Sequence, residues 1–97
     1  MNDLERIKKG INEHREELEQ KYKVKSIAIF GSYVRGEQKK GSDIDILVEF
    51  TEPVGLLCIS SLGNYLSDIL RTSVDVVPKK NIRKELKDAI LREAIPI

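Results

Sequence analysis

The stretch VKSIAIFGSYVRGEQKKGSDIDILVEF, from Val24 to Phe50, decides the fold of this chain. Residues 24–30 are rich in β-branched and aromatic side chains, which predicts an interior strand. Residues 43–50 alternate between polar and apolar, which predicts a second strand with one buried face. A Gly-Ser pair follows the first strand directly, and an Asp-x-Asp triplet opens the second. The sequence therefore places its most distinctive residues at the ends of two strands.

Elements on either side of this stretch complete a small α/β domain. Asp3 to Tyr22 predicts one amphipathic helix with Asp3 as its N-cap. Thr51-Glu52-Pro53 predicts the start of a second long helix, and residues 74–77 predict a short strand. A last helix, capped by Asn81, buries a side formed by Ile82, Leu86, Ala89 and Ile90. The order α-β-(short α)-β-α-β-α predicts helices packed on one small sheet, without deciding the polarity of its strands.

Length and composition limit the class of protein. The 97 residues suffice for one domain, 1–97, and are too few for two. With 17 basic and 16 acidic residues, the chain has no overall field that would attract nucleic acid or a membrane surface. Cys58 has no partner for an internal disulfide, and the charged N-terminus does not resemble a signal peptide. We therefore expect a soluble cytoplasmic protein that binds neither membranes nor nucleic acid directly.

The Gly-Ser pair predicts a site for an anion at the end of the first strand. Gly31 has no side chain, so a phosphate group can approach its backbone closely. Ser32 offers a hydroxyl, and backbone N–H groups at the start of the following short helix favour negative charge. Ser32 is equally suited to capping that helix, a role compatible with phosphate contact. Arg35 either contacts phosphate or pairs with Glu37 or another acid, and the sequence leaves both readings open.

Three aspartates predict a site for a divalent cation. Asp43 and Asp45 leave the same face of the second strand about 7 Å apart, a geometry suited to Mg²⁺. Asp75 interrupts a β-branched strand, where a charge is costly to bury unless it is paired or bound to a metal. If the two strands are neighbours, the three carboxylates form one cluster that could hold two ions for phosphoryl transfer. Without metal binding, Asp43 and Asp45 would lie on a solvated strand face and Asp75 on an exposed edge strand.

Together these residues resemble a known superfamily. Gly31-Ser32, ten intervening residues, Asp43-Ile44-Asp45 and the later Asp75 are similar to the signature of the DNA polymerase β-like nucleotidyltransferases. Gly-Ser-Tyr-Val-Arg-Gly at 31–36, Pro-Val-Gly-Leu-Leu at 53–57 and Leu-Arg-Glu-Ala-Ile at 91–95 resemble the minimal nucleotidyltransferase (MNT) branch. The resemblance implies the nucleotidyltransferase fold, like the palm of polymerase β.

The resemblance also implies a function and a role for each residue. Gly31 and Ser32 would bind the nucleotide, with Arg35 as a further candidate from its position, while Asp43, Asp45 and Asp75 would be catalytic and hold Mg²⁺, two ions in all, or Mn²⁺. The implied reaction transfers AMP from ATP to a hydroxyl. Members of the MNT branch are typically encoded with a HEPN-domain toxin and act as its antitoxin by adding AMP to a toxin tyrosine. The expected partner is therefore a HEPN-domain toxin.

Two other functions stay open at this level. The chain could neutralise a toxin by binding alone, although an intact set of Gly-Ser and three aspartates argues against a vestigial site. It could also act on a small molecule or on RNA, although such relatives generally carry an additional helical domain. The sequence does not define the acceptor, the preferred base, the oligomeric state or any requirement for the partner. It also leaves undefined the role of a basic cluster formed by Lys79, Lys80, Arg83, Lys84 and Lys87.

Overall fold

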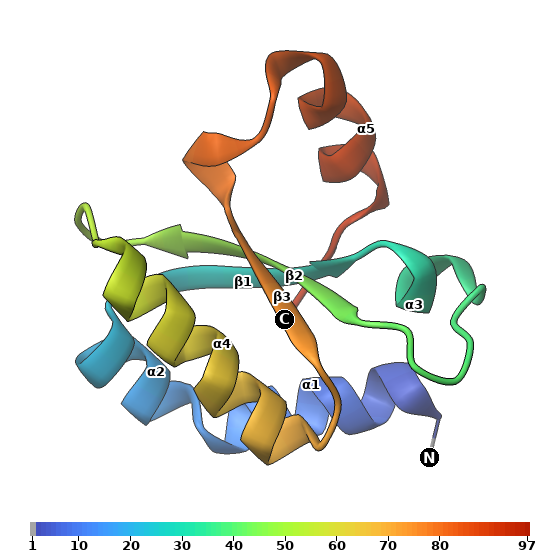
Figure 1. Cartoon of the computed structure of the whole chain (residues 1–97), viewed down its shortest axis with the longest axis horizontal. Coiled ribbons are helices and arrows are strands. Elements are labelled where there is room, and N and C mark those ends of the chain that lie inside the picture. Colours follow the sequence, from blue (N-terminus) through green and yellow to red (C-terminus); the bar gives the residue numbers. More distant parts are fainter. Residues whose placement is uncertain (1) are drawn as a thin grey trace.

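A computed structural model describes residues 2–97 of the chain. Figure 1 shows the arrangement of its helices and strands. In chain order the elements are α1 (Asp3–Glu13), α2 (Arg15–Tyr22), β1 (Val24–Phe30), α3 (Ser32–Arg35), β2 (Ile44–Phe50), α4 (Leu56–Leu70), β3 (Val74–Pro78), the 3₁₀ turn η1 (Lys79–Asn81), α5 (Lys84–Glu93) and β4 (Ile95–Pro96). The predicted α/β class is therefore confirmed.

The strands form one mixed sheet in the order β3-β2-β1-β4. β1 pairs antiparallel with β2 on one side and with the two-residue strand β4 on the other. β3 runs parallel to β2, because α4 carries the chain back along the sheet before β3 begins. The sheet therefore has mixed polarity, and β4 is a strand that the hydropathy pattern did not predict.

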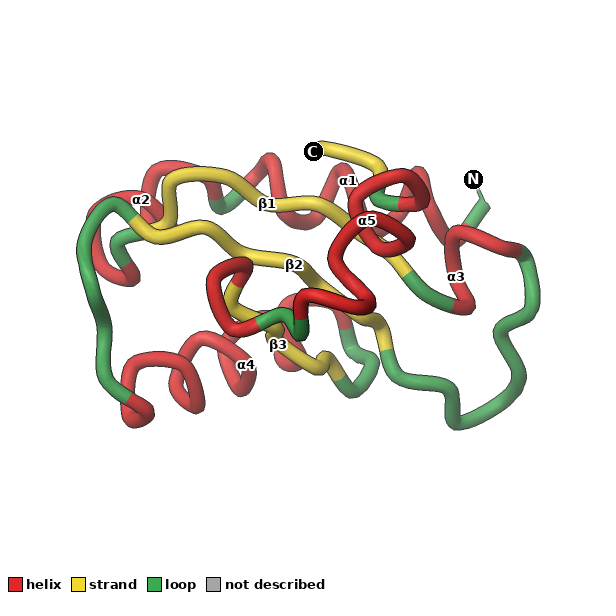
Figure 2. Tube along the Cα trace, turned by 90° about the horizontal axis from the view of Figure 1, so that it is seen from above, coloured by secondary structure: helices red, strands yellow, loops and turns green. Residues whose placement is uncertain are grey.

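The two faces of the sheet differ in what covers them. Helices α1, α2 and α4 lie on one face, where Ile44, Ile46 and Val48 of β2 are fully buried (Figure 1). Side chains of a strand alternate between faces, so Asp45 and Glu49 point to the other side. The helix α5 lies over that second face, as the views in Figures 1 and 2 both show. The predicted alternation of the second strand is confirmed, and its acidic face is the less covered one.

The first predicted helix is divided in two. α1 ends at His14, whose φ of −115° and ψ of 16° are not helical, and α2 begins immediately after it. The His14 ring hydrogen-bonds through Nδ1 to the carbonyl oxygen of Gly10 at 2.8 Å. The N-cap is Asn2 and not Asp3, because Asn2 Oδ1 accepts a hydrogen bond from the Glu5 N–H at 2.8 Å. The single predicted helix was therefore wrong at its cap and at its middle.

The helix predicted from Thr51 begins five residues later, at Leu56. The Thr51 N–H donates to the carbonyl oxygen of Lys23 at 2.8 Å, which holds Thr51 at the end of the β1–β2 pair. Residues 52–55 then lead from the sheet to the helical layer, and Gly55 caps α4 in an extended conformation. The prediction of a helix start at 51–53 was wrong because tertiary contacts retain this segment at the sheet.

The last helix also differs from its prediction. α5 begins at Lys84, whereas the predicted cap, Asn81, belongs to η1. No side chain of α5 is fully buried, and Leu86 is 52% exposed. Within residues 2–97, no second helix packs over α5 on this face of the sheet, so its apolar stripe is not enclosed. The predicted buried side at Ile82, Leu86, Ala89 and Ile90 is therefore wrong for the chain on its own.

Within residues 2–97, no helix combines the length and the apolar character needed to cross a bilayer.

Candidate functional site

The acidic residues meet where β2 and β3 lie side by side. Asp45 and Asp75 are direct partners in the parallel pairing, so they occupy neighbouring positions on the same face of the sheet. Asp43 immediately precedes β2, two residues before Asp45. Opposite Asp45 on the other side of β2 stands Phe30, the last residue before Gly31. The structure thus brings the three predicted aspartates and the Gly-Ser pair to one end of the sheet.

The electrostatics of Asp45 show that these acids affect one another. Partial burial raises the pKa of Asp45 above its ordinary value, and the charges of Asp75 and Asp43 raise it further. The positive charge of Arg35 lowers the pKa of Asp45. Several carboxylates in one place repel, so this cluster carries more negative charge than the chain itself balances.

Gly31 stands directly against the Asp45 carboxylate. It has a φ of +83°, a conformation that glycine adopts without strain. A Cβ added at this position would collide with Oδ2 of Asp45. Glycine is therefore required here by its own backbone conformation and by the close approach of Asp45. The sequence predicted a close approach to Gly31, and the structure shows that a carboxylate already makes one.

Arg35 forms two ion pairs. Its Nε lies 2.7 Å from Glu37 Oε1, and its Nη1 lies 2.7 Å from Glu93 Oε1. These hydrogen bonds raise the pKa of Arg35 above its ordinary value, so the guanidinium is always charged. Of the two readings that the sequence left open, acid pairing is present in this structure. Ser32 precedes Arg35 by three residues at the start of α3 and is half-buried.

Glu93 is a site residue that the sequence did not predict. It is the last residue of α5, yet its Oε2 accepts a hydrogen bond from the Gly31 N–H at 2.7 Å. Burial raises the pKa of Glu93, but the Gly31 N–H and Arg35 outweigh that effect and hold it below its ordinary value. In the sequence, the signal for Glu93 was its place in the Leu-Arg-Glu-Ala-Ile stretch that resembles the MNT branch. Its contact with Gly31 could not be predicted, because 62 residues separate the two along the chain.

The donor set fits hard divalent cations, which prefer carboxylate oxygens. Among residues 2–97, no three His, Cys, Asp or Glu side chains form a group that could by itself hold a metal ion. Mg²⁺ usually keeps waters and takes substrate phosphates as further ligands, so a site of this kind needs few protein oxygens. The uncompensated charge around Asp45 is what a cation would neutralise.

Comparison with known families identifies the family to which the chain belongs. The model of the nucleotidyltransferase domain family matches residues 11–97, which contain the Gly-Ser pair, the three aspartates and Glu93. The chain belongs to this nucleotidyltransferase family.

Two relatives place the nucleotidyltransferase within the family. Protein adenylyltransferase MntA of Thermococcus cleftensis is 41% identical over 92 residues, which cover 95% of this chain and 93% of the relative. The protein MJ0126 of Methanocaldococcus jannaschii is 54% identical over 82 residues, or 84% of each chain. Among solved structures, a toxin–antitoxin complex with AMP-PNP contains a chain with a TM-score of 0.71 and 25% identity, covering 99% of this chain and 72% of that one. The expected membership of the MNT branch, and with it enzymatic nucleotidyl transfer, is confirmed.

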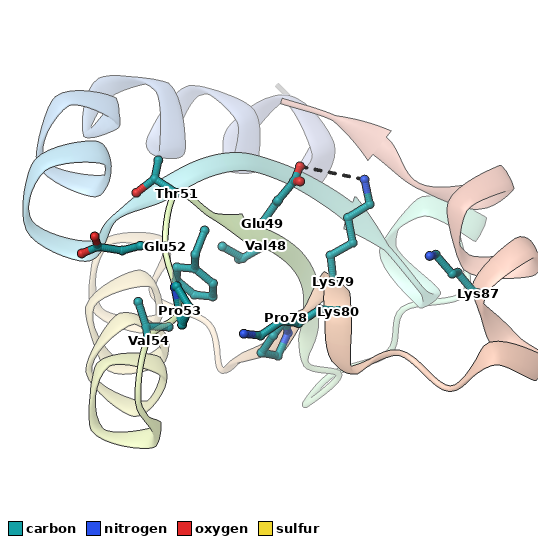
Figure 3. A pocket seen from close by; sticks show the side chains of 11 residues that line it. Val48, Glu49, Thr51, Glu52, Pro53, Val54, Pro78, Lys79, Lys80 and Lys87 are labelled. Atoms are coloured by element: carbon teal, nitrogen blue, oxygen red, sulfur yellow. Dashed lines mark ion pairs between the residues drawn. The ribbon is translucent and has the colours of Figure 1, made fainter.

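The nucleotidyltransferase also has a cavity of about 440 Å³ at the opposite end of β2 (Figure 3). Glu49, Phe50 and Pro78 contribute to its walls, and three of the five residues of the basic cluster, Lys79, Lys80 and Lys87, line it as well. Lys79 Nζ lies 3.9 Å from Glu49 Oε1. Glu49 is four residues beyond Asp45 on the same strand, a separation of about 13 Å, so this cavity is distinct from the carboxylate cluster.

Proposed function

We propose that this chain transfers AMP from ATP to the hydroxyl of a tyrosine on a HEPN-domain toxin, and so acts as its antitoxin. The observation that carries the proposal is the pairing of Asp45 with Asp75 beside Asp43 and the Gly-Ser turn. Such a cluster suits chemistry in which divalent cations would balance the negative charge of both the carboxylates and the substrate polyphosphate. Because the substrate is ATP, we place the reaction in the cytoplasm.

The relatives support both the proposed AMP transfer and the proposed antitoxin role. The similar MntA is named a protein adenylyltransferase, which matches transfer of AMP to a protein. The similar solved chain belongs to a toxin–antitoxin complex crystallised with AMP-PNP, an analogue of ATP. A further solved complex with the same fold holds a tri-AMPylated HEPN toxin with its MNT antitoxin. A HEPN-domain protein is therefore the partner class that we propose here.

In the proposed reaction, the acceptor oxygen forms a bond to the α-phosphorus of ATP while the bond from that phosphorus to the bridging oxygen breaks. AMP stays on the acceptor, and pyrophosphate leaves with the electron pair of the broken bond. Asp75, exposed at the edge strand, takes the acceptor proton. The hydroxyl of Ser32 and the guanidinium of Arg35 contact the phosphates. Two Mg²⁺ ions held by Asp43, Asp45 and Asp75, or Mn²⁺ in their place, would supply charge neutralisation at the attacking and leaving oxygens.

The decisive experiment weighs the partner. The purified chain is incubated with its HEPN-domain partner, ATP and Mg²⁺, and the partner is analysed by intact mass spectrometry. Each transfer is expected to add about 329 Da, and tandem spectra are expected to place it on a tyrosine. Asp45→Asn and Asp75→Asn are expected to abolish the addition, because a carboxamide cannot replace an anionic ligand. Asp68→Asn, at an exposed position on α4, is the matched control and should retain it.

Two results would contradict the proposal. A partner whose mass never changes, yet whose toxicity is neutralised by a chain lacking all three aspartates, would show that binding alone is the function. Transfer that persists in Asp45→Asn and Asp75→Asn would show that the carboxylate cluster is not the catalytic centre.

A further inference from the structure

We infer that Glu93 is a positioning residue for the Gly31–Arg35 turn, fixing the segment that contacts the nucleotide phosphates. This inference rests on the proposed function, because it concerns how the same site binds ATP. Glu93 comes from the far end of the chain and reaches the turn from α5. Its carboxylate uses both oxygens, one on each end of the turn. The Glu93 side chain therefore links Gly31, at the start of the turn, to Arg35, at its end.

The first contact continues the edge of the sheet. The Ile97 N–H donates to the carbonyl oxygen of Ile27 at 2.9 Å, and Ile29 pairs with Ile95, so alternate residues of β1 direct their backbone groups toward β4. Gly31 is next in that alternation. Opposite Gly31 the chain has not yet entered β4, and the Glu93 carboxylate, at the end of α5, accepts the Gly31 N–H instead. The N–H thus lies along the sheet edge and is already bonded, which leaves the Ser32 hydroxyl and Arg35 to contact phosphate.

The second contact orients Arg35. The guanidinium is a rigid planar fork with five N–H groups. Glu37 holds Nε and Glu93 holds Nη1, each at 2.7 Å, so two separate anchors define the plane of the fork. Three N–H groups remain for phosphate oxygens. The Glu93 side chain is 22% exposed and that of Glu37 64% exposed, so Glu93 is the better shielded anchor.

The experiment compares three variants with the wild-type chain: Glu93→Ala, Glu93→Gln and, as a control for the lost charge, Glu85→Gln on the same helix. Calorimetry measures the affinity for a non-hydrolysable ATP analogue with Mg²⁺. NMR measures amide exchange at Gly31 and the order of the Arg35 Nε–H without nucleotide. Steady-state kinetics separate KM for ATP from kcat.

Glu93→Ala is expected to weaken analogue binding about tenfold, the effect of one lost hydrogen bond to a charged group, and to raise KM with kcat nearly unchanged. It should also disorder Arg35 and speed exchange at Gly31 by about tenfold. Glu93→Gln has one amide oxygen to offer, so it should protect Gly31 but leave Arg35 disordered, with intermediate affinity. Glu85→Gln should match the wild type in every measurement.

Unchanged affinity in Glu93→Ala would reduce Glu93 to a structural contact and overturn the inference. Tighter binding would overturn it in another way, because Glu93 would then compete with phosphate. These results differ from a failure of the proposed function, in which the wild-type chain binds the analogue but modifies no partner. A wild-type chain that binds no nucleotide would contradict both.

Discussion

Gly31 shows how one residue can satisfy two demands that only the fold makes visible. Its φ of +83° excludes most side chains on conformational grounds alone. The Asp45 carboxylate also occupies the space where a Cβ would stand. The absence of a side chain therefore lets the end of β1 and the Asp45 carboxylate lie in direct contact, a requirement separate from the approach of a phosphate.

We expect Gly31→Ala to lower the free energy of unfolding by about 1–3 kcal/mol and to displace Asp45. Analogue binding in the presence of Mg²⁺ should fall with it, as measured by urea unfolding and calorimetry. Gly55→Ala is the matched control, because Gly55 has a φ of −84° and open space around its Cα. Equal stability and affinity in Gly31→Ala and Gly55→Ala would show that the contact with Asp45 is not restrictive.

At the scale of elements, the helical layer is joined by a small aromatic cluster. The Tyr65 hydroxyl of α4 donates to Glu17 Oε2 of α2 at 2.8 Å. The Tyr65 ring centroid lies 5.1 Å from that of Tyr22 and 5.9 Å from that of His14. The break between α1 and α2 thus places His14, at the end of α1, and Tyr22, at the end of α2, beside the Tyr65 ring. This cluster connects the N-terminal helices to α4.

The same cluster predicts a dependence of stability on pH. Burial and the Glu17 hydrogen bond raise the pKa of Tyr65 to about 12. Between pH 10 and pH 12 the unfolded chain loses the tyrosine proton while the folded chain keeps it, so the free energy of unfolding falls as pH rises. Tyr65→Phe should lose about 0.5–1.5 kcal/mol at pH 7 and show a smaller further loss at pH 11.

Urea unfolding at pH 7 and pH 11 checks this prediction. Tyr33→Phe serves as the control, since Tyr33 lies on α3 and is outside the cluster. A wild-type chain and a Tyr65→Phe variant with parallel losses between the two pH values would contradict it.

At the scale of the whole molecule, the site is a point of accumulated negative charge. Asp43 immediately precedes β2, Asp45 comes from β2, Asp75 from β3 and Glu93 from α5, and Arg35 lowers the pKa of Asp45. Such a cluster costs stability in the absence of cations, because like charges repel. The carboxylates proposed to hold cations therefore lower the stability of the fold when no cation is bound.

We expect Asp45→Asn to raise the free energy of unfolding at pH 7 in EDTA by a few tenths to about 1 kcal/mol, a value reduced by solvent screening. The sign follows from the raised pKa of Asp45, since the folded state disfavours its charged form. The variant should also lose the stabilisation that Mg²⁺ and an ATP analogue give the wild type, as measured by thermal unfolding. Asp68→Asn should keep it. A destabilised Asp45→Asn variant would contradict the expected repulsion.

The sequence by itself determined the strands predicted at 24–30 and 43–50, the second within one residue of β2, together with the α/β class and the family. Strand alternation and the spacing of Gly-Ser, Asp-x-Asp and Asp75 are local or short-range patterns, so they can be read along the chain. Their placement at one end of the sheet followed once β2 and β3 were neighbours. The predicted helices were less accurate at their ends, because contacts such as Thr51 with Lys23 decide where a helix begins.

Only the tertiary structure decided the polarity of the strands, the position of α5 and the role of Glu93. A hydrophobic stripe records that a helix side is apolar and does not record which surface faces it, so the exposed Leu86 was predicted to be buried. Glu93 lies in a charged, solvent-facing helix whose composition gives no reason to single it out. It acquires a role because β4 returns along β1 and brings the end of α5 to Gly31, 62 residues earlier in the chain. Contacts between residues so distant depend on the path of the whole chain, and no local pattern encodes them.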